Sequence, residues 1–275
     1  MGAGPLPSTV LTQSEPSSVL PPAPLVLAIQ NDPTDPPLLV GEWLAEDGIR
    51  IEVIRAFDGE AVPATVPAGV SGILALGGDM GAHDDHVAPW LVDERALLVD
   101  AVARGIPVLG LCLGGQLLAA ANGGRVTLGP ATEIGVVQVQ RTVDGFLDPV
   151  ISQAVPASGA DIPAPQWHQD NIVDLPDGAV LLLTNEACPV QGFRLGDTAY
   201  GLQLHPEVDV ETFASWAHMA DAVLARSGRN GDDAASEMRA ARHELIRAWR
   251  PMARSWGDLV WMRASDGADP FTLPA

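Results

Sequence analysis

Lysine is absent from the 275-residue chain, so all fifteen basic residues are arginine. This excludes catalysis through a lysine Schiff base and excludes the lysine with which P-loop proteins grip nucleotide phosphates. Positive charge is scarce as well, because 35 acidic residues leave a formal net charge of −20. A field of that sign repels phosphate backbones and anionic lipids, so neither nucleic acid nor a membrane is an expected partner.

Cysteine and long apolar runs are also in short supply. Two cysteines, Cys112 and Cys188, are too few for a disulfide framework and fit a reducing compartment, so we expect a cytoplasmic protein. The longest apolar runs, such as Val108–Leu113, have the length of strands and fall short of a bilayer. The segment Met1–Pro24 has no basic residue and is rich in proline and serine, which predicts a disordered leader and not a signal peptide.

The first half of the remaining chain alternates predicted strands with predicted helices. Strands are expected at Leu25–Gln30, Ile49–Ile54, Gly72–Leu76 and Pro107–Leu111. Helices are expected at Leu38–Glu46, Asp93–Arg104 and Leu113–Ala121. This alternation is typical of βαβ units built around a mostly parallel sheet.

The second half of the chain has a different pattern. Strands separated by short turns are predicted at Glu133–Arg141, Ala179–Thr184, Pro189–Arg194 and Thr198–Leu204, which favours added antiparallel strands. Two amphipathic helices follow, near Asp209–Arg226 and Asp233–Leu259. We therefore expect a single α/β domain over residues 25–275, including two C-terminal helices.

Cys112 is the candidate nucleophile. It ends a buried strand, and Gly110 and Gly114 give the backbone room for an abrupt turn into the next helix. Such a turn pushes the reactive side chain out at the carboxyl end of the strand. The helix N-terminus favours a thiolate, and its free N–H groups can hold an oxyanion. The alternative is that Cys112 is merely a small buried apolar residue.

His205 is the preferred base for this cysteine. It follows the predicted strand, and Glu207 lies two residues further on, with Pro206 between them. Residues i and i+2 of an extended chain project to the same side, so Glu207 can accept a hydrogen bond from the imidazole and fix its tautomer.

The other histidines fit other roles. His83 and His86 lie in a polar loop without the helical or strand spacing that would hold metal ligands on one face, so no metal is expected. His168 is interpreted as a loop residue in the wall of a pocket. His218 and His243 fall in the predicted terminal helices, where a surface role is the default.

The combination of Gly110-x-Cys112-x-Gly114-x-Gln116 with His205-Pro206-Glu207 resembles the class I glutamine amidotransferases, and in particular their free-standing, GMP-synthase-like members. The resemblance extends over residues 25–260. Further matching pieces are Gly77-Gly78-Asp79-Met80, Glu133-Ile134-Gly135, Trp167-His168, Gln191-Gly192-Phe193-Arg194 and Gly201-Leu202-Gln203-Leu204. The likeness implies a flavodoxin-like three-layer sandwich and a reaction that needs no cofactor.

The resemblance also implies residue roles. Cys112 would attack the glutamine amide carbon, His205 would carry the proton to ammonia, and Glu207 would orient His205. The backbone N–H groups of Gly78 and Leu113 would form the oxyanion hole. The substrate would be contacted by Gln116, Trp167 and His168. Many relatives carry proline where Asp79 stands, which implies a more mobile loop around Gly78.

Three functions remain open from the sequence. The chain could be a glutaminase that feeds ammonia to a synthase, and we expect that synthase to be a separate chain because no synthase domain follows. It could be a stand-alone γ-glutamyl peptide hydrolase that uses the same triad on a larger leaving amine. An intact Cys112, His205 and Glu207 disfavours the third possibility, a catalytically silent binding module.

Overall fold

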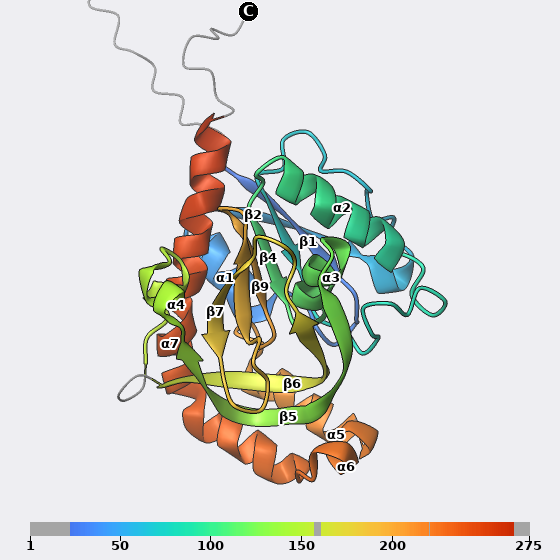
Figure 1. The fold of residues 1–275 in the computed structure, drawn as a ribbon, viewed down its shortest axis with the longest axis vertical. Helices are drawn as coiled ribbons and strands as arrows, with labels where there is room; N and C mark the ends of the chain where they lie inside the picture. Colours follow the sequence, from blue (N-terminus) through green and yellow to red (C-terminus); the bar gives the residue numbers. More distant parts are fainter. Residues whose placement is uncertain (1–22, 157–160, 220, 267–275) are drawn as a thin grey trace, which may run out of the picture.

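The computed structural model describes residues 23–156, 161–219 and 221–266 (Figure 1). The expected leader Met1–Pro24 lies outside the described residues except for its last two positions. The carbonyl of Pro24 accepts a hydrogen bond from the Arg50 backbone N–H over 2.9 Å, so the sheet begins to pair at this point.

One half of the central sheet is parallel. Its strands are β1 (Leu25–Gln30), β2 (Arg50–Arg55), β3 (Gly72–Ala75), β4 (Val108–Leu111) and β9 (Ala199–Leu202), in the order β2-β1-β3-β4-β9. Each neighbouring pair in this order is parallel. Every residue of β3, β4 and β9 is buried, which explains why these strands are continuous apolar runs in the sequence.

The other half of the sheet is antiparallel. It continues from β9 through β8 (Gly192–Leu195), β7 (Val180–Thr184), β5 (Arg125–Arg141) and β6 (Asp161–Asp174). The expected antiparallel strands are thus present, although β5 begins eight residues before the predicted strand at Glu133. Strand β6 was not predicted, and His168, expected in a loop, lies within it.

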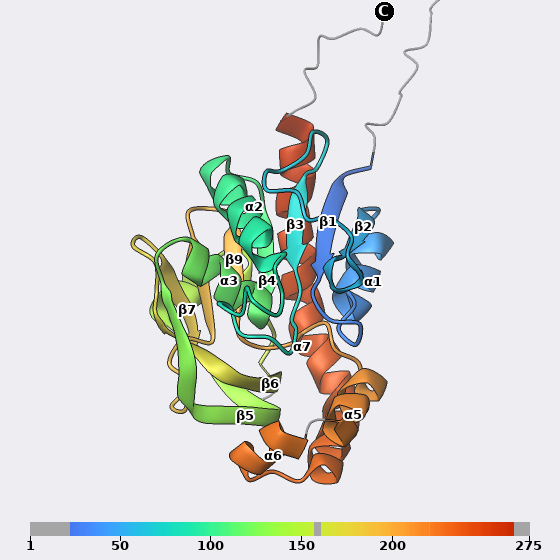
Figure 2. The same cartoon turned by 90° about the vertical axis from the view of Figure 1, so that its right-hand side faces the viewer.

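Helices cover both faces of the sheet and make three layers (Figure 2). Helices α1 (Leu38–Glu46) and α7 (Gly231–Asp266) pack on one face, where Trp249 and Trp256 are fully buried. Helices α2 (Leu91–Ala103) and α3 (Leu113–Ala121) pack on the other. The flavodoxin-like sandwich expected from the sequence is therefore confirmed. The short helix α4 (Val143–Leu147) and the 3₁₀ turns η1 (Ala56–Asp58) and η2 (Ile151–Gln153) lie in connections.

The C-terminal helices enclose one end of the molecule. Helices α5 (Val210–Met219) and α6 (Asp221–Ser227) occupy the range predicted as one helix, and α7 is longer than predicted at both ends. In Figure 1, β5 and β6 cross the lower end of the sheet, and α5 and α6 lie beyond them. A small apolar cluster that includes Ile134, Phe213 and Trp216 joins these elements. Within the described ranges, no helix combines the length and the apolar character that crossing a membrane requires.

Candidate functional site

The candidate site lies at the carboxyl ends of four neighbouring strands. The loops after β1 and β3, the turn after β4 and the segment after β9 meet there, because these strands are consecutive in the sheet order β1-β3-β4-β9. This edge is where open parallel sheets place their ligands.

Cys112 occupies the sharp turn between β4 and α3. Its backbone has φ 48° and ψ −108°, a conformation that side-chain-bearing residues rarely adopt. The turn closes only with glycines around it: a Cβ on Gly114 would lie 2.0 Å from the Ala75 carbonyl oxygen, and one on Gly110 would lie 2.6 Å from Gly114. The residue is 6% exposed and lines a cavity, so the turn presents Cys112 at the floor of that cavity.

His205 and Glu207 form a buried pair. Nδ1 of His205 lies 2.6 Å from Oε1 of Glu207, and both side chains are almost completely buried. Two backbone bonds fix the segment, from the His205 N–H to the Pro165 carbonyl and from the Leu39 N–H to the Glu207 carbonyl. The Trp216 ring packs edge-on against the imidazole, 5.0 Å away between centroids. The imidazole is therefore held in one orientation.

The charges around His205 favour its imidazolium form. Burial lowers the pKa of His205, but its electrostatic and hydrogen-bonding interactions with Cys112 and Glu207 more than offset this and hold the pKa well above its ordinary value. Nε2 is buried and makes no hydrogen bond of ordinary geometry with the described residues. That nitrogen is thus available to give a proton to a leaving group.

Gly78 and Leu113, the expected oxyanion-hole pair, come together beside Cys112. A Cβ on Gly78 would lie 3.2 Å from the Leu113 side chain, and both residues line the same cavity as Cys112. Leu113 is the first residue of α3, where the backbone N–H has no acceptor within the helix. The arrangement can place two N–H donors around a developing oxyanion.

One cavity extends from Cys112 toward β6, and we call it the cysteine pocket. Its walls include Gly78, Cys112, Leu113, Gln116, Trp167 and His168. Gln116 is 3% exposed and its amide N–H₂ donates to the Asp170 carbonyl and to Oε1 of Gln203. The Gln203 amide in turn contacts the Cys112 sulfur at 3.8 Å, a link that the sequence did not indicate.

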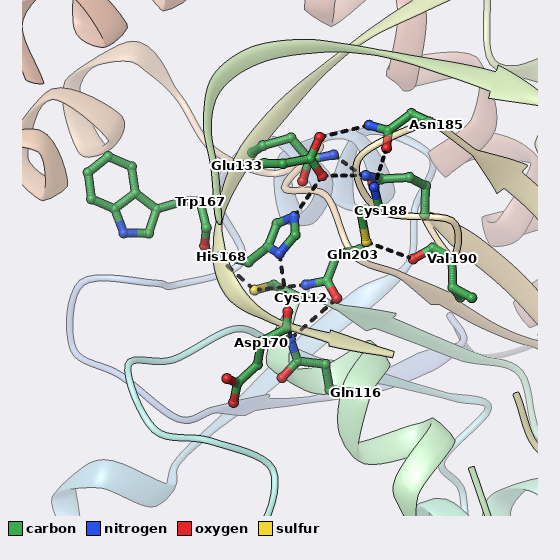
Figure 3. A network of polar contacts seen from close by, with 12 residues as sticks. Cys112, Gln116, Glu133, Trp167, His168, Asp170, Asn185, Cys188, Val190 and Gln203 are labelled. Carbon is green, nitrogen blue, oxygen red and sulfur yellow. Dashed lines mark hydrogen bonds and ion pairs between the residues drawn. The ribbon is translucent and has the colours of Figure 1, made fainter. Parts of the chain in front are cut away.

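A buried polar network supports the pocket wall behind His168 (Figure 3). Nε2 of His168 bonds Oε2 of Glu133 at 3.0 Å, and Nδ1 lies 3.1 Å from the Asp170 carbonyl. Gln191 and Asn185 also donate to the Glu133 carboxylate. These hydrogen bonds lower the pKa of Glu133 against the opposing effect of its burial. His168 is therefore fixed at both ring nitrogens and cannot readily serve as a mobile base.

Trp167 and Cys188 lie on either side of this network. The Trp167 ring points away from the network in Figure 3 and packs against Phe213 and Trp216, at 5.3 and 6.1 Å between centroids. Cys188 is fully buried, and its burial raises the pKa of the thiol to about 12. Cys188 is thus a non-nucleophilic thiol at neutral pH.

A second cavity of about 490 Å³ opens on the other side of Cys112, and we call it the histidine chamber. Its walls include Asp32, Asp35, Asp79, Cys112, His205 and Trp216. Asp35 is 2% exposed, and neither carboxyl oxygen makes a hydrogen bond of ordinary geometry with the described residues. Burial, and then the Glu207 charge, raise the pKa of Asp35 well above its ordinary value. Sequence reasoning missed Asp35, because nothing in the local pattern signals its burial.

Potential metal ligands gather in two places among the described residues. One group is Glu133, His168 and Cys188, and the other is Asp35, His205 and Glu207. Both groups belong to the site described above. His83 and His86, the histidines of the polar loop, are exposed and belong to neither group.

The fold places a cysteine at the sharp turn after β4, and a comparison with known families shows where the chain belongs. The family model described as "Glutamine amidotransferase class-I" matches residues 44–217. The chain belongs to this family.

Individual relatives differ in the activity that their names carry. The chain is 29% identical to the putative glutamine amidotransferase-like protein YfeJ of Salmonella typhimurium, over 76% of this chain and 87% of that one. It is 26% identical to γ-glutamyl peptidase 3 of Arabidopsis thaliana, over 77% and 84%. It is 30% identical to a glutamine-hydrolysing GMP synthase subunit of Halobacterium salinarum, over 59% and 77%. Several other GMP synthases match over only 20% to 31% of their own length.

A solved structure of a glutamine amidotransferase has a similar fold. A glutamine amidotransferase from Thermotoga maritima superposes with a TM-score of 0.71 and 28% identity, covering 86% of this chain and 98% of that chain. The range that the family model matches, residues 44–217, includes Cys112, His205 and Glu207.

Proposed function

We propose that the chain hydrolyses the side-chain amide of glutamine through a thioester on Cys112 and supplies the ammonia to a separate synthase chain in the cytosol. The observation that carries the proposal is the meeting of Cys112, His205 and Glu207 at one edge of the sheet, in a chain of the class I glutamine amidotransferase family.

The proposed reaction has two stages. Sγ of Cys112 attacks the amide carbon, the C–S bond forms and the C–N bond breaks, and Nε2 of His205 gives the departing nitrogen its proton. Water then hydrolyses the thioester and releases glutamate. Glu207 holds the imidazole in place throughout, and the N–H groups of Gly78 and Leu113 stabilise the oxyanion of each stage.

The separate acceptor is supported by the likeness to a protein named as one subunit of a GMP synthase. A chain that supplies ammonia gains from low activity when alone, because ammonia released without an acceptor is wasted. The loop of Gly78 can provide this restraint: Asp79 stands where many relatives carry a stiffening proline. If the Gly78 N–H pointed away from the oxyanion, kcat would fall by roughly a hundredfold.

The test compares glutamine hydrolysis by the purified chain with hydrolysis in the presence of the synthase that co-purifies with it. We expect slow hydrolysis by the chain alone and a stimulation of roughly a hundredfold by the partner. Fast hydrolysis by the chain alone, unchanged by any co-purifying protein, would contradict the role of ammonia supplier.

A second candidate is a stand-alone γ-glutamyl peptide hydrolase. The size of the histidine chamber favours it, since about 490 Å³ is far more than ammonia needs, and the likeness to γ-glutamyl peptidase 3 agrees. Cleavage of a γ-glutamyl dipeptide well above the glutamine rate, without a partner, would establish this function in place of the first.

A further inference from the structure

The two cavities around Cys112 divide a bound amide between them. Leu113, Gln116 and His168 line the cysteine pocket and not the histidine chamber, so the pocket receives the acyl side of the scissile bond. His205 lines the histidine chamber and does not line the cysteine pocket. Because His205 protonates the leaving nitrogen, that nitrogen departs into the chamber. This assignment rests on the proposed thioester chemistry.

The chamber is large for ammonia. A water-sized molecule takes about 30 Å³ in the liquid, whereas the chamber has about 490 Å³. Trp167, Trp216 and Met219 give it an apolar side that a carbon chain can contact. The space therefore suits an amine that carries a substituent of several atoms.

The chamber is also rich in carboxyl groups. Among the residues that the structure describes, its titratable lining consists of Asp32, Asp35 and Asp79 together with Cys112 and His205. Asp79 and Asp32 are close enough that the Asp32 charge adds to the effect of burial in raising the pKa of Asp79. Asp35 adds a carboxyl group, 98% buried, whose two oxygens make no hydrogen bond of ordinary geometry with the described residues. Burying a carboxyl group without such bonds costs free energy. A hydrogen-bond donor that enters the chamber would offset this cost.

We propose that the histidine chamber binds a positively charged substituent on the leaving amine, so that the enzyme also hydrolyses γ-glutamyl amides of diamines. A second ammonium group would lie among the aspartates and donate to them, with its carbon chain against the tryptophans. A γ-glutamyl amino acid would instead place a carboxylate near the aspartates, and we expect it to be cleaved more slowly than the diamine amide.

The proposed step balances as for glutamine. The C–N bond to the diamine breaks as the C–S bond to Cys112 forms, and the nitrogen takes the proton from Nε2 of His205. Water then cleaves the thioester. The products are glutamate and the free diamine, and no oxidant, reductant or nucleotide is consumed.

The experiment measures kcat/KM for glutamine and for three γ-glutamyl amides that share a four-carbon chain. The amides are those of 1,4-diaminobutane, butylamine and 4-aminobutyrate, whose free ends are positive, neutral and negative. We expect kcat/KM to be highest for the amide with the positive end, intermediate for the neutral one and lowest for the negative one. The first and last should differ by at least tenfold at low ionic strength. We expect the preference to shrink several-fold in Asp32→Asn and Asp79→Asn, because asparagine keeps the shape and removes the charge.

Asp144→Asn, on the exposed face of α4, is the matched control for the loss of one negative charge, and it should keep the full preference. Equal rates for the three amides, a preference for the negative end, or a preference unchanged in both aspartate variants would overturn the inference. Hydrolysis of glutamine with none of the three amides cleaved would overturn it too, and would leave the proposed function intact. Folded protein that hydrolyses neither glutamine nor any amide, with or without its partner, would overturn both.

Discussion

Nδ1 of His205 lies 2.6 Å from Oε1 of Glu207, and neither side chain is more than 4% exposed. A carboxylate in this position can select the tautomer that leaves Nε2 without the proton, and in the proposed reaction it would stabilise the imidazolium. The contact joins two residues of the segment that follows β9 into one buried pair.

Replacing Glu207 by glutamine should therefore slow turnover more than it weakens binding. Glutamine keeps the shape of the side chain but removes the charge that stabilises the imidazolium, so we expect kcat to fall by roughly a hundredfold or more and KM to change little. Steady-state kinetics on glutamine measure both. A large rise in KM with an unchanged kcat would show that Glu207 acts only on binding.

The two cysteines should respond differently to substitution. Cys112→Ser should abolish glutamine hydrolysis, because a serine hydroxyl is far less ionised at neutral pH than a thiol. Cys188→Ser should change activity little, since burial raises the pKa of the Cys188 thiol to about 12 and keeps it out of the chemistry. Activity assays paired with circular dichroism provide the comparison. Equal losses in two folded variants would remove Cys112 from its role.

His168→Ala should affect the pocket wall. The substitution deprives the buried Glu133 carboxylate of a hydrogen bond over 3.0 Å, and the wall should loosen. We expect KM for glutamine to rise roughly tenfold while kcat stays within a few-fold. His218→Ala, at an exposed position of α5, is the control and should leave both constants unchanged. An inactive His168→Ala beside an active His205→Ala would identify His168 as the base.

Glu94 should make stability depend on pH. It is fully buried in α2, near Asn31, and burial raises its pKa to about 8. Between its ordinary pKa of 4.5 and about 8, the folded state keeps a proton that the unfolded state has lost, so stability falls as pH rises through this window.

Glu94→Gln removes this proton uptake and keeps the shape of the side chain. The Tm of the variant should rise relative to that of the wild type as pH increases from 5 to 8. The reason is that the wild type loses up to about 1.4 kcal/mol of unfolding free energy per pH unit in this window, and the variant does not. Thermal unfolding of both proteins across this range tests the expectation. Parallel Tm curves would show that Glu94 is ionised in the folded state.

Strands β3, β4 and β9 of the parallel half could be predicted from the sequence because each is fully buried and reads as an apolar run. Strand β6 was missed for the opposite reason. Pro163 and Pro165 argue against a strand, yet β6 is the last strand of the sheet and pairs only with β5, so missing N–H groups are tolerated there.

The site was predictable only where its residues share a local motif. Cys112 stands out through its glycines, and His205 with Glu207 through a spacing of two. The other features of the site depend on contacts between residues 35 to 172 positions apart in the chain. These contacts join Asp35 to Glu207, Gln203 to Cys112 and His168 to Glu133. No window of sequence carries such contacts, so the acidity of the histidine chamber could be recognised only in the structure.

The central claim is that a glutamyl thioester forms on Cys112. The most direct measurement is an acid quench of the protein during turnover of glutamine, followed by peptide mapping by mass spectrometry. We predict one glutamyl adduct, on the peptide that contains Cys112. Turnover of glutamine by Cys112→Ser at the wild-type rate, or an adduct located on Cys188, would contradict the account.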